Sequence, residues 1–208
     1  MRKFIFCIST ITALSLLFYI VRENRTIDTI SVHIGKPYEE VSRDSTFPIK
    51  KKTVIYPSES PEPDSIWMRN PVIVKFDDPR HGFTLPPTKF GVIGFNDWKV
   101  TNITTSPMLE TLPFDQLVPL LNHVQKMLKA SGWVPQDNHF TWINLDSEIE
   151  KNALQNLLFK QVVVMTLRVP HKYGLSLNIK CYARCNERDP KTAKYLIDVS
   201  VGKDFSNQ

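Results

Sequence analysis

The chain has 208 residues, of which 42% are apolar and 23% are charged, the composition of an ordinary globular protein with room for one domain and an anchor. Its formal net charge is +5, but residues 1–25 carry +3 of this, and the remaining 22 basic and 20 acidic residues leave only +2. Because binding to a phosphate backbone needs many clustered cations, this distribution argues against a nucleic-acid partner.

Residues 4–21 form an apolar segment without a single charge, FIFCISTITALSLLFYIV. As a helix, these eighteen residues would be about 27 Å long, close to the thickness of the hydrocarbon core of a bilayer. A cleaved signal peptide is the alternative, but such a peptide ends in small residues, whereas this run ends in Phe18, Tyr19, Ile20 and Val21. The sequence therefore predicts a transmembrane helix within residues 1–25, acting as an uncleaved signal-anchor.

The orientation of this anchor is predicted from the short segment before it and the long domain after it, because the flanking charges are nearly balanced. Two basic residues precede the apolar run and two follow it, so the positive-inside rule is nearly balanced. A two-residue head normally stays in the cytoplasm while the long domain crosses. We expect a single-pass inner-membrane protein with residues 26–208 forming one periplasmic domain.

The first half of this domain is expected to consist mainly of strands. Residues 26–35 predict a strand by their β-branched alternation, and residues 36–44 predict a short helix. Residues 48–71 contain five prolines, and we expect this Pro-rich segment to be irregular apart from a short edge strand at Thr53–Tyr56. The remaining expected elements are a strand at 71–76, a turn at 77–82 and a hairpin of strands 90–95 and 99–105 around Asn96 and Asp97.

The second half changes to a helical period. Apolar residues recur at helical spacing in 113–131 and 146–160, with Asp146 or Ser147 able to cap the second helix. Strands are expected at 161–169, 175–182 and 195–201. The predicted fold is α+β, an antiparallel sheet with two main helices packed on one face, preceded by the N-terminal transmembrane helix.

A polar cluster of Asp77, Asp78, Arg80 and His81 is the strongest candidate for catalysis. As an enzyme, the chain would use His81 as a general base oriented by a carboxylate. Asp-Pro and His-Gly are ordinary turn dipeptides, however, and the acids would then cap backbone donors or pair with Arg80. We favour the turn, and we expect no catalytic residues, no cofactor and no metal site.

Cys181 and Cys185 are the two cysteines outside the anchor. A zinc site would need two further ligands at definite spacing, and a redox pair would more often be spaced Cys-x-x-Cys. A structural disulfide is the simplest interpretation, as an oxidising compartment would permit.

Among the four tryptophans, Trp67 is the one expected outside the core, because it lies in the Pro-rich segment.

Four stretches carry a family resemblance: GKPYEEVSRDSTFPI, NPVIVKFDDPRHGFTLPPTKFG, TTSPMLETLPFDQLVPLL and LNIKCYARCNERDPKTAKYLIDVSVGKDF. They resemble a group of membrane-anchored proteobacterial proteins, and the resemblance covers nearly all of residues 30–205. The group is similar to products encoded near type VI secretion effectors, where membrane-tethered periplasmic partners often act as immunity proteins. Residues 34–41 are also similar to the start of small envelope lipoprotein domains that scaffold outer-membrane assembly. Neither resemblance assigns functional residues.

We therefore expect a membrane-tethered periplasmic protein that binds a protein partner, in one form an immunity protein against a secreted toxic effector. An envelope assembly scaffold is the first alternative. An envelope hydrolase that uses Asp78 and His81 is the alternative from another class.

Overall fold

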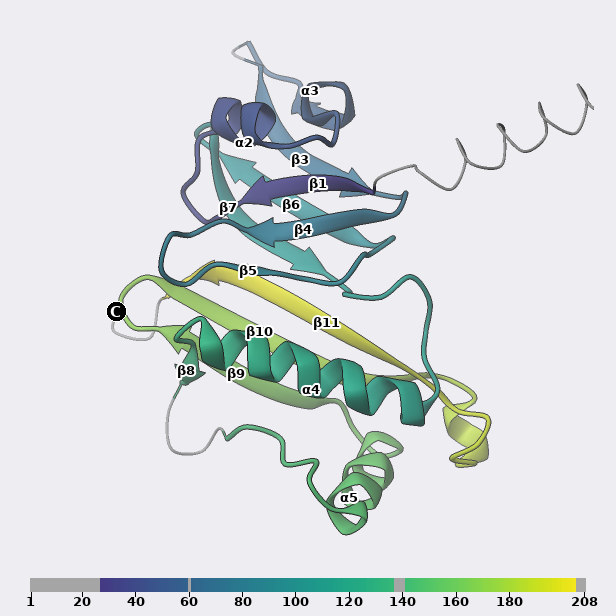
Figure 1. Ribbon diagram of the computed structural model, residues 1–208. Coiled ribbons are helices and arrows are strands. Elements are labelled where there is room, and N and C mark those ends of the chain that lie inside the picture. The colour runs from purple at the N-terminus through teal and green to yellow at the C-terminus, as the bar shows by residue number, and fades with distance from the viewer. Residues whose placement is uncertain (1–26, 60, 137–140, 205–208) are drawn as a thin grey trace, which may run out of the picture.

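The computed structural model describes residues 27–59, 61–136 and 141–204 (Figure 1). The predicted anchor and the question of its cleavage lie outside these residues. Within them, no helix is both long enough and apolar enough to cross a membrane. The elements in chain order are β1 (Asp28–Val32), α2 (Tyr38–Asp44), α3 (Ile49–Lys52), β2 (Thr53–Tyr56), β3 (Glu62–Met68), β4 (Val72–Phe76), β5 (Phe83–Thr84), β6 (Gly91–Asn96), β7 (Lys99–Thr105), α4 (Phe114–Ala130), β8 (Val134–Pro135), α5 (Glu148–Leu158), β9 (Val163–Val169), β10 (Tyr173–Ala183), η1 (Cys185–Glu187) and β11 (Lys194–Lys203).

The fold is α+β with two sheets, where the sequence predicted one. Eight antiparallel strands form the large sheet in the order β2-β3-β6-β7-β11-β10-β9-β8. A small sheet has the order β1-β4-β5, and its β1–β4 pair is parallel. The pair is parallel because the chain between β1 and β4 makes a crossover through α2, α3, β2 and β3 and returns to the same end of the sheet.

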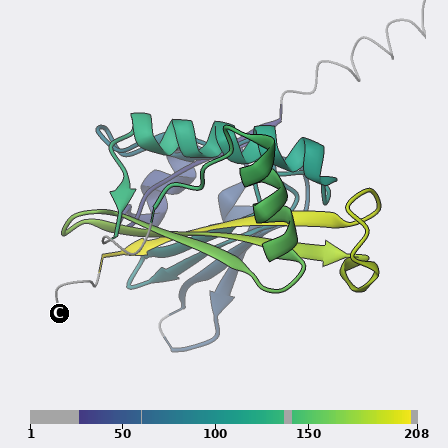
Figure 2. The ribbon, with the colours of Figure 1, turned by 90° about the horizontal axis from the view of Figure 1, so that it is seen from below.

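Both main helices cover the same face of the large sheet, as predicted. The ring of Tyr195 on β11 packs against Phe114 at the start of α4 and against Phe159 just after α5. Strands β10 and β11 alternate between buried and partly exposed residues along most of their length, which is the pattern of a sheet covered on one side. Figure 2 shows α4 and α5 together on one side of these strands.

Helix α4 forms because its apolar residues recur at helical spacing. Leu117, Leu121, Val124 and Leu128 are all fully buried against the sheet. Helix α5 begins at a capping box, in which the Ser147 hydroxyl accepts from the Glu150 amide while the Glu150 carboxylate accepts from the Ser147 amide. Ser147, one of the two residues that the sequence offered as caps, therefore serves as the N-cap.

The small sheet lies over the other half of the large sheet, and aromatic side chains join the layers. Tyr38 on α2 makes an edge contact with Phe95 on β6. At the end of β4, Phe76 packs against Trp133 and against Tyr173 on β10. One cluster of buried apolar residues therefore runs through both sheets and their helices.

The Pro-rich segment is more regular than expected. Residues 48–71 contain α3, β2 and β3, so the expectation of an irregular segment is wrong apart from the edge strand, which occurs at Thr53–Tyr56 as predicted. The prolines are tolerated because of where they fall. Pro57 and Pro61 lie in the connection between the two strands, and Pro63 pairs with Ile55 beyond the last pair that joins β3 to β6.

Candidate functional site

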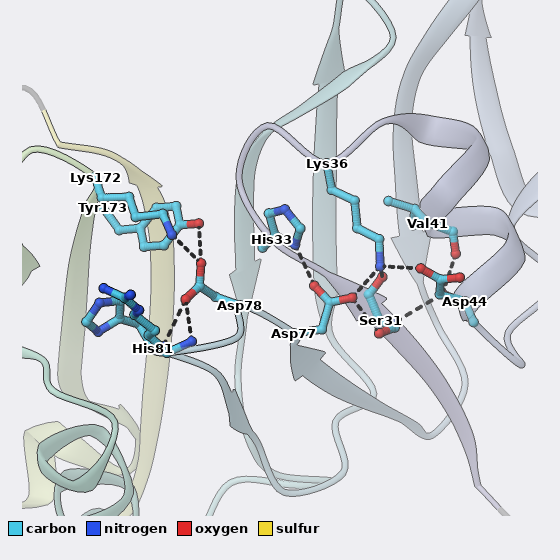
Figure 3. A network of polar contacts seen from close by, with 12 residues as sticks. Ser31, His33, Lys36, Val41, Asp44, Asp77, Asp78, His81, Lys172 and Tyr173 are labelled. Atoms are coloured by element: carbon cyan, nitrogen blue, oxygen red, sulfur yellow. Dashed lines mark hydrogen bonds and ion pairs between the residues drawn. The ribbon is translucent and has the colours of Figure 1, made fainter.

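The adjacent residues Asp77 and Asp78 follow β4 directly, and their carboxylates point to opposite sides (Figure 3). Asp77 faces β1 and the loop before α2, whereas Asp78 faces β10. Successive side chains at the end of an extended strand point in opposite directions, so one dipeptide supplies two separate polar networks.

The Asp78 carboxylate accepts four hydrogen bonds. Its Oδ1 accepts from the backbone amides of Arg80 at 3.0 Å and His81 at 2.9 Å. Its Oδ2 accepts from the Lys172 ammonium at 2.5 Å and from the Tyr173 hydroxyl at 2.9 Å. Only 2% of the Asp78 side chain is exposed, so no face of this carboxylate is open to a substrate.

These contacts shift two pKa values. Burial alone would raise the pKa of Asp78, but the hydrogen bonds from Lys172, from the amides of Arg80 and His81 and from Tyr173 outweigh it and hold that pKa far below its ordinary value. Burial, together with the Asp78 carboxylate, raises the pKa of the Tyr173 hydroxyl. Asp78 is therefore ionised and Tyr173 protonated at neutral pH, which suits a fixed hydrogen bond between them.

His81 is turned away from this carboxylate. Its ring donates from Nδ1 to the backbone carbonyl of Ser131 at 3.0 Å, just after α4. Its own carbonyl accepts from the Trp133 indole at 3.1 Å, and Ser131 donates to the carbonyl of Gly82 at 2.7 Å. The turn is thus attached to the end of α4, and Asp78 contacts the backbone of His81 but not its imidazole. This is the capping turn that the sequence favoured, with Lys172 as the ionic partner where Arg80 was expected.

The Asp77 carboxylate gathers three donors from the other side. It accepts from the Ser31 hydroxyl at 2.7 Å, from His33 Nδ1 at 2.6 Å and from the ammonium of Lys36. Lys36 is almost fully buried, and it also donates to the carbonyl of Ser31 at 3.1 Å and forms an ion pair with Asp44 at 3.0 Å. Burial would raise the pKa of Asp77, but the hydrogen bonds from Lys36, His33 and Ser31 lower it overall.

Sequence reasoning missed the His33–Asp77 pair, because the two residues are 44 positions apart. The parallel register pairs Val32 with Phe76, which brings the next residues of both strands together. Chemically, a carboxylate that fixes one imidazole nitrogen leaves the other available for proton transfer. Within the described ranges, however, no group of three or more His, Cys, Asp or Glu residues is arranged to hold a metal ion.

Cys181 and Cys185 are joined by a disulfide, with Cα atoms 5.9 Å apart. The bond closes the end of β10 onto η1, where Arg184 adopts a left-handed backbone with φ of 56°. It therefore shapes the tip of the long β10–β11 connection.

Apolar side chains are exposed at one edge of the large sheet. Strand β2 pairs with β3 and with no other strand of the described part of the chain. Its residues Val54, Ile55 and Tyr56 are each about half exposed, as is Trp67 on β3. We call these four residues the edge patch. Trp67 is outside the core, as the sequence predicted, but Trp98, which was expected in the core, is 45% exposed as well.

The open face of the large sheet carries a row of small polar groups beside Trp67. The registers of five successive strand pairs place one residue of each strand side by side. From Trp67 the row passes the apolar Val92 and continues through the polar residues Thr104, Ser200, Ser176 and Thr166. No described helix is seen on this side of the sheet (Figure 2). The face is therefore accessible and largely uncharged along its centre.

Comparisons with protein-family models, with curated proteins and with solved structures found no match for this chain.

We predict that Asp78→Ala lowers the free energy of unfolding by about 3 kcal/mol, because a buried hydroxyl and two amides lose their acceptor. Asp28→Ala, at an exposed position, is the matched control and should change it by under about 0.5 kcal/mol. Denaturant titration of both variants measures the difference. Equal stability of the two variants would show that the contacts of the Asp78 carboxylate contribute nothing to the free energy of unfolding.

The same network predicts a pH dependence. A folded-state pKa below the ordinary value of about 4 contributes stability above that pH, and this contribution is lost as the pH falls toward the lowered value. The wild-type free energy of unfolding should therefore decrease on acidification below about pH 5. Asp78→Ala should flatten the decrease, and an unchanged slope would contradict this origin.

The disulfide predicts that protein purified without reductant carries no free thiol at Cys181 or Cys185. Mass spectrometry after alkylation measures this, with a reduced sample as the control. Cys181→Ala should cost roughly 2 kcal/mol of stability, since the bond closes a short loop. Alkylation of both thiols in the unreduced sample would contradict the pairing.

Proposed function

We propose that this chain is a membrane-tethered periplasmic binding protein that contacts a protein partner through the edge patch, in the form of an immunity protein that occupies a toxic effector. The observation that carries the proposal is the run of three exposed apolar residues, Val54, Ile55 and Tyr56, on an edge strand. The apolar segment 4–21 would supply the tether and hold the domain at the inner membrane.

An edge strand is suited to receive a strand from another protein. Its outer backbone groups can pair with an added strand, while exposed side chains provide selectivity. Strand β2 is short, carries a register shift between Val54 and Ile55, and is followed by Pro57, which together discourage pairing between copies of this chain.

The charge beside the edge patch indicates the partner. Lys50, Lys51 and Lys52 directly precede β2 and are exposed, and Lys50 forms an ion pair with Glu39 at 2.7 Å. These lysines repel a second copy of the same edge and attract an acidic strand. The partner segment that fits is thus extended, apolar in its centre and acidic at one end.

The hydrolase alternative gains little from the geometry. Asp78 is fully used by four donors, and the His81 ring faces a backbone carbonyl. An assembly scaffold would use the same edge patch with a different partner, so the two binding hypotheses differ in the partner and agree on the surface.

A growth assay tests this proposal. The full chain is co-expressed with a candidate toxin from an adjacent gene, directed to the periplasm, and we expect the chain to restore growth. Ile55→Asp should abolish protection, because it places a charge in the edge patch beside an acidic partner strand. Val164→Asp is the matched control, since Val164 on β9 has the same exposure as Ile55 but lies toward the opposite end of the sheet.

His81→Ala separates binding from catalysis in the same assay. If the chain acts by binding, protection should survive this change, whereas loss of a general base lowers a rate about 100-fold or more. Loss of protection by His81→Ala in a folded protein would overturn the binding proposal. Protection that survives Ile55→Asp would instead remove the edge patch from it.

A further inference from the structure

The short connection between the apolar segment and β1 limits which end of the domain can lie near the membrane. The apolar segment ends at Val21, and β1 begins at Asp28. Seven residues span at most about 25 Å even when fully extended. The end of the domain that contains the start of β1 is therefore held close to the bilayer, if the tether of the proposed function is correct.

Strand pairing connects Asp28 with a second region at this end. Asp28 pairs with Val72, and Val72 exchanges two backbone hydrogen bonds with Thr88 at 2.8 and 2.9 Å. Two interstrand spacings place Thr88 about 10 Å from Asp28. The Thr88 hydroxyl in turn donates to the carbonyl of Phe90 at 2.6 Å, which fixes the backbone of Phe90 close by.

Exposed apolar side chains gather here around a groove of about 410 Å³. Phe90 is 49% exposed, Leu109 is 43% exposed and Tyr182 is 64% exposed, and all three line the groove together with Lys89. Single exposed apolar residues are normal on a protein surface, but three around one groove form a continuous contact surface. We call these three residues and Lys89 the groove rim.

The charged lining of the groove consists of one internal ion pair together with Lys89 and Glu110. Ser106 donates to Asp198 at 2.5 Å, and Lys180 forms an ion pair with the same carboxylate at 2.7 Å. The charges of Asp198 and Lys180 are thus balanced inside the groove, while Lys89 stands on the rim with the aromatic rings.

We propose that the groove rim docks on the lipid–water interface of the membrane that holds the anchor. Aromatic side chains with one apolar and one polar end are favoured at the headgroup level, and a lysine beside them can meet lipid phosphates. The tether keeps the bilayer at high effective concentration, so a small contact suffices to orient the domain. This inference rests on the membrane tether of the proposed function and adds the face that meets the lipid.

The docking is tested with the full chain in vesicles of phosphatidylethanolamine and phosphatidylglycerol. A nitroxide label is attached at Leu109→Cys in a Cys7→Ser background, and its collisions with oxygen and with a water-soluble nickel complex are compared. We expect the Leu109 label to collide more with oxygen than with the nickel complex, because the label would lie at the membrane interface. A label at Ile149→Cys on α5, which is 81% exposed, is the control and should favour nickel.

The variant pair Phe90→Asp and Tyr182→Asp should move the Leu109 label into water while leaving the Ile149 label unchanged. A Leu109 label that favours nickel in the otherwise wild-type chain would overturn the docking. Spin–spin broadening at Leu109 would also overturn it, by showing a second copy of the chain in the groove. Extraction of the chain from the vesicles by alkaline carbonate would instead refute the tether. Failure of the docking can therefore be distinguished from failure of the proposed membrane anchor.

Discussion

The structure depends on two adjacent carboxylates that serve different parts of the fold. Asp77 attaches the end of β4 to β1 and, through Lys36, to α2, whereas Asp78 attaches the following turn to β10. The turn also hydrogen-bonds to residues just after α4 through His81 and Gly82. The small sheet, the large sheet and the main helix therefore meet at one dipeptide.

The two carboxylates are held by contacts within the fold. The most conspicuous charged motif of the chain is used for internal contacts, since Asp78 accepts four hydrogen bonds and is almost completely buried. A buried carboxylate with all its donors in place stabilises one arrangement, because loss of any part leaves polar groups without partners. The exposed apolar side chains of the edge patch and the groove rim are surfaces on which other molecules could bind. Trp67 of the edge patch pairs with Val92, two residues from Phe90 of the groove rim, so the two surfaces adjoin on the open face of the large sheet.

Local patterns predicted the elements of the fold well. The helical period of Leu117, Leu121 and Val124 predicted α4, and the strands expected at 161–169, 175–182 and 195–201 correspond to β9, β10 and β11. The hairpin turn was expected at Asn96 and Asp97, and the left-handed residues are Asp97 and Trp98, one position later. Such patterns are local because they express the geometry of a single helix or turn.

The pairings between distant segments were not available from the sequence. Asp78 and Tyr173 are 95 residues apart, and no local rule connects them. The second sheet was missed because parallel pairing of β1 with β4 requires the crossover of α2 and β3, and the prolines around β3 hid that strand. The same omission concealed His33, since only the β1–β4 register places it beside Asp77.

The coupling between Asp78 and Tyr173 tests the central claim, that this dipeptide joins β4 to the large sheet. A double-mutant cycle with Asp78→Ala and Tyr173→Phe, read as the free energy of unfolding, isolates their interaction. A coupling free energy of about 1 kcal/mol or more is expected, since the carboxylate and the hydroxyl are buried partners. Strictly additive effects of the two substitutions would contradict it.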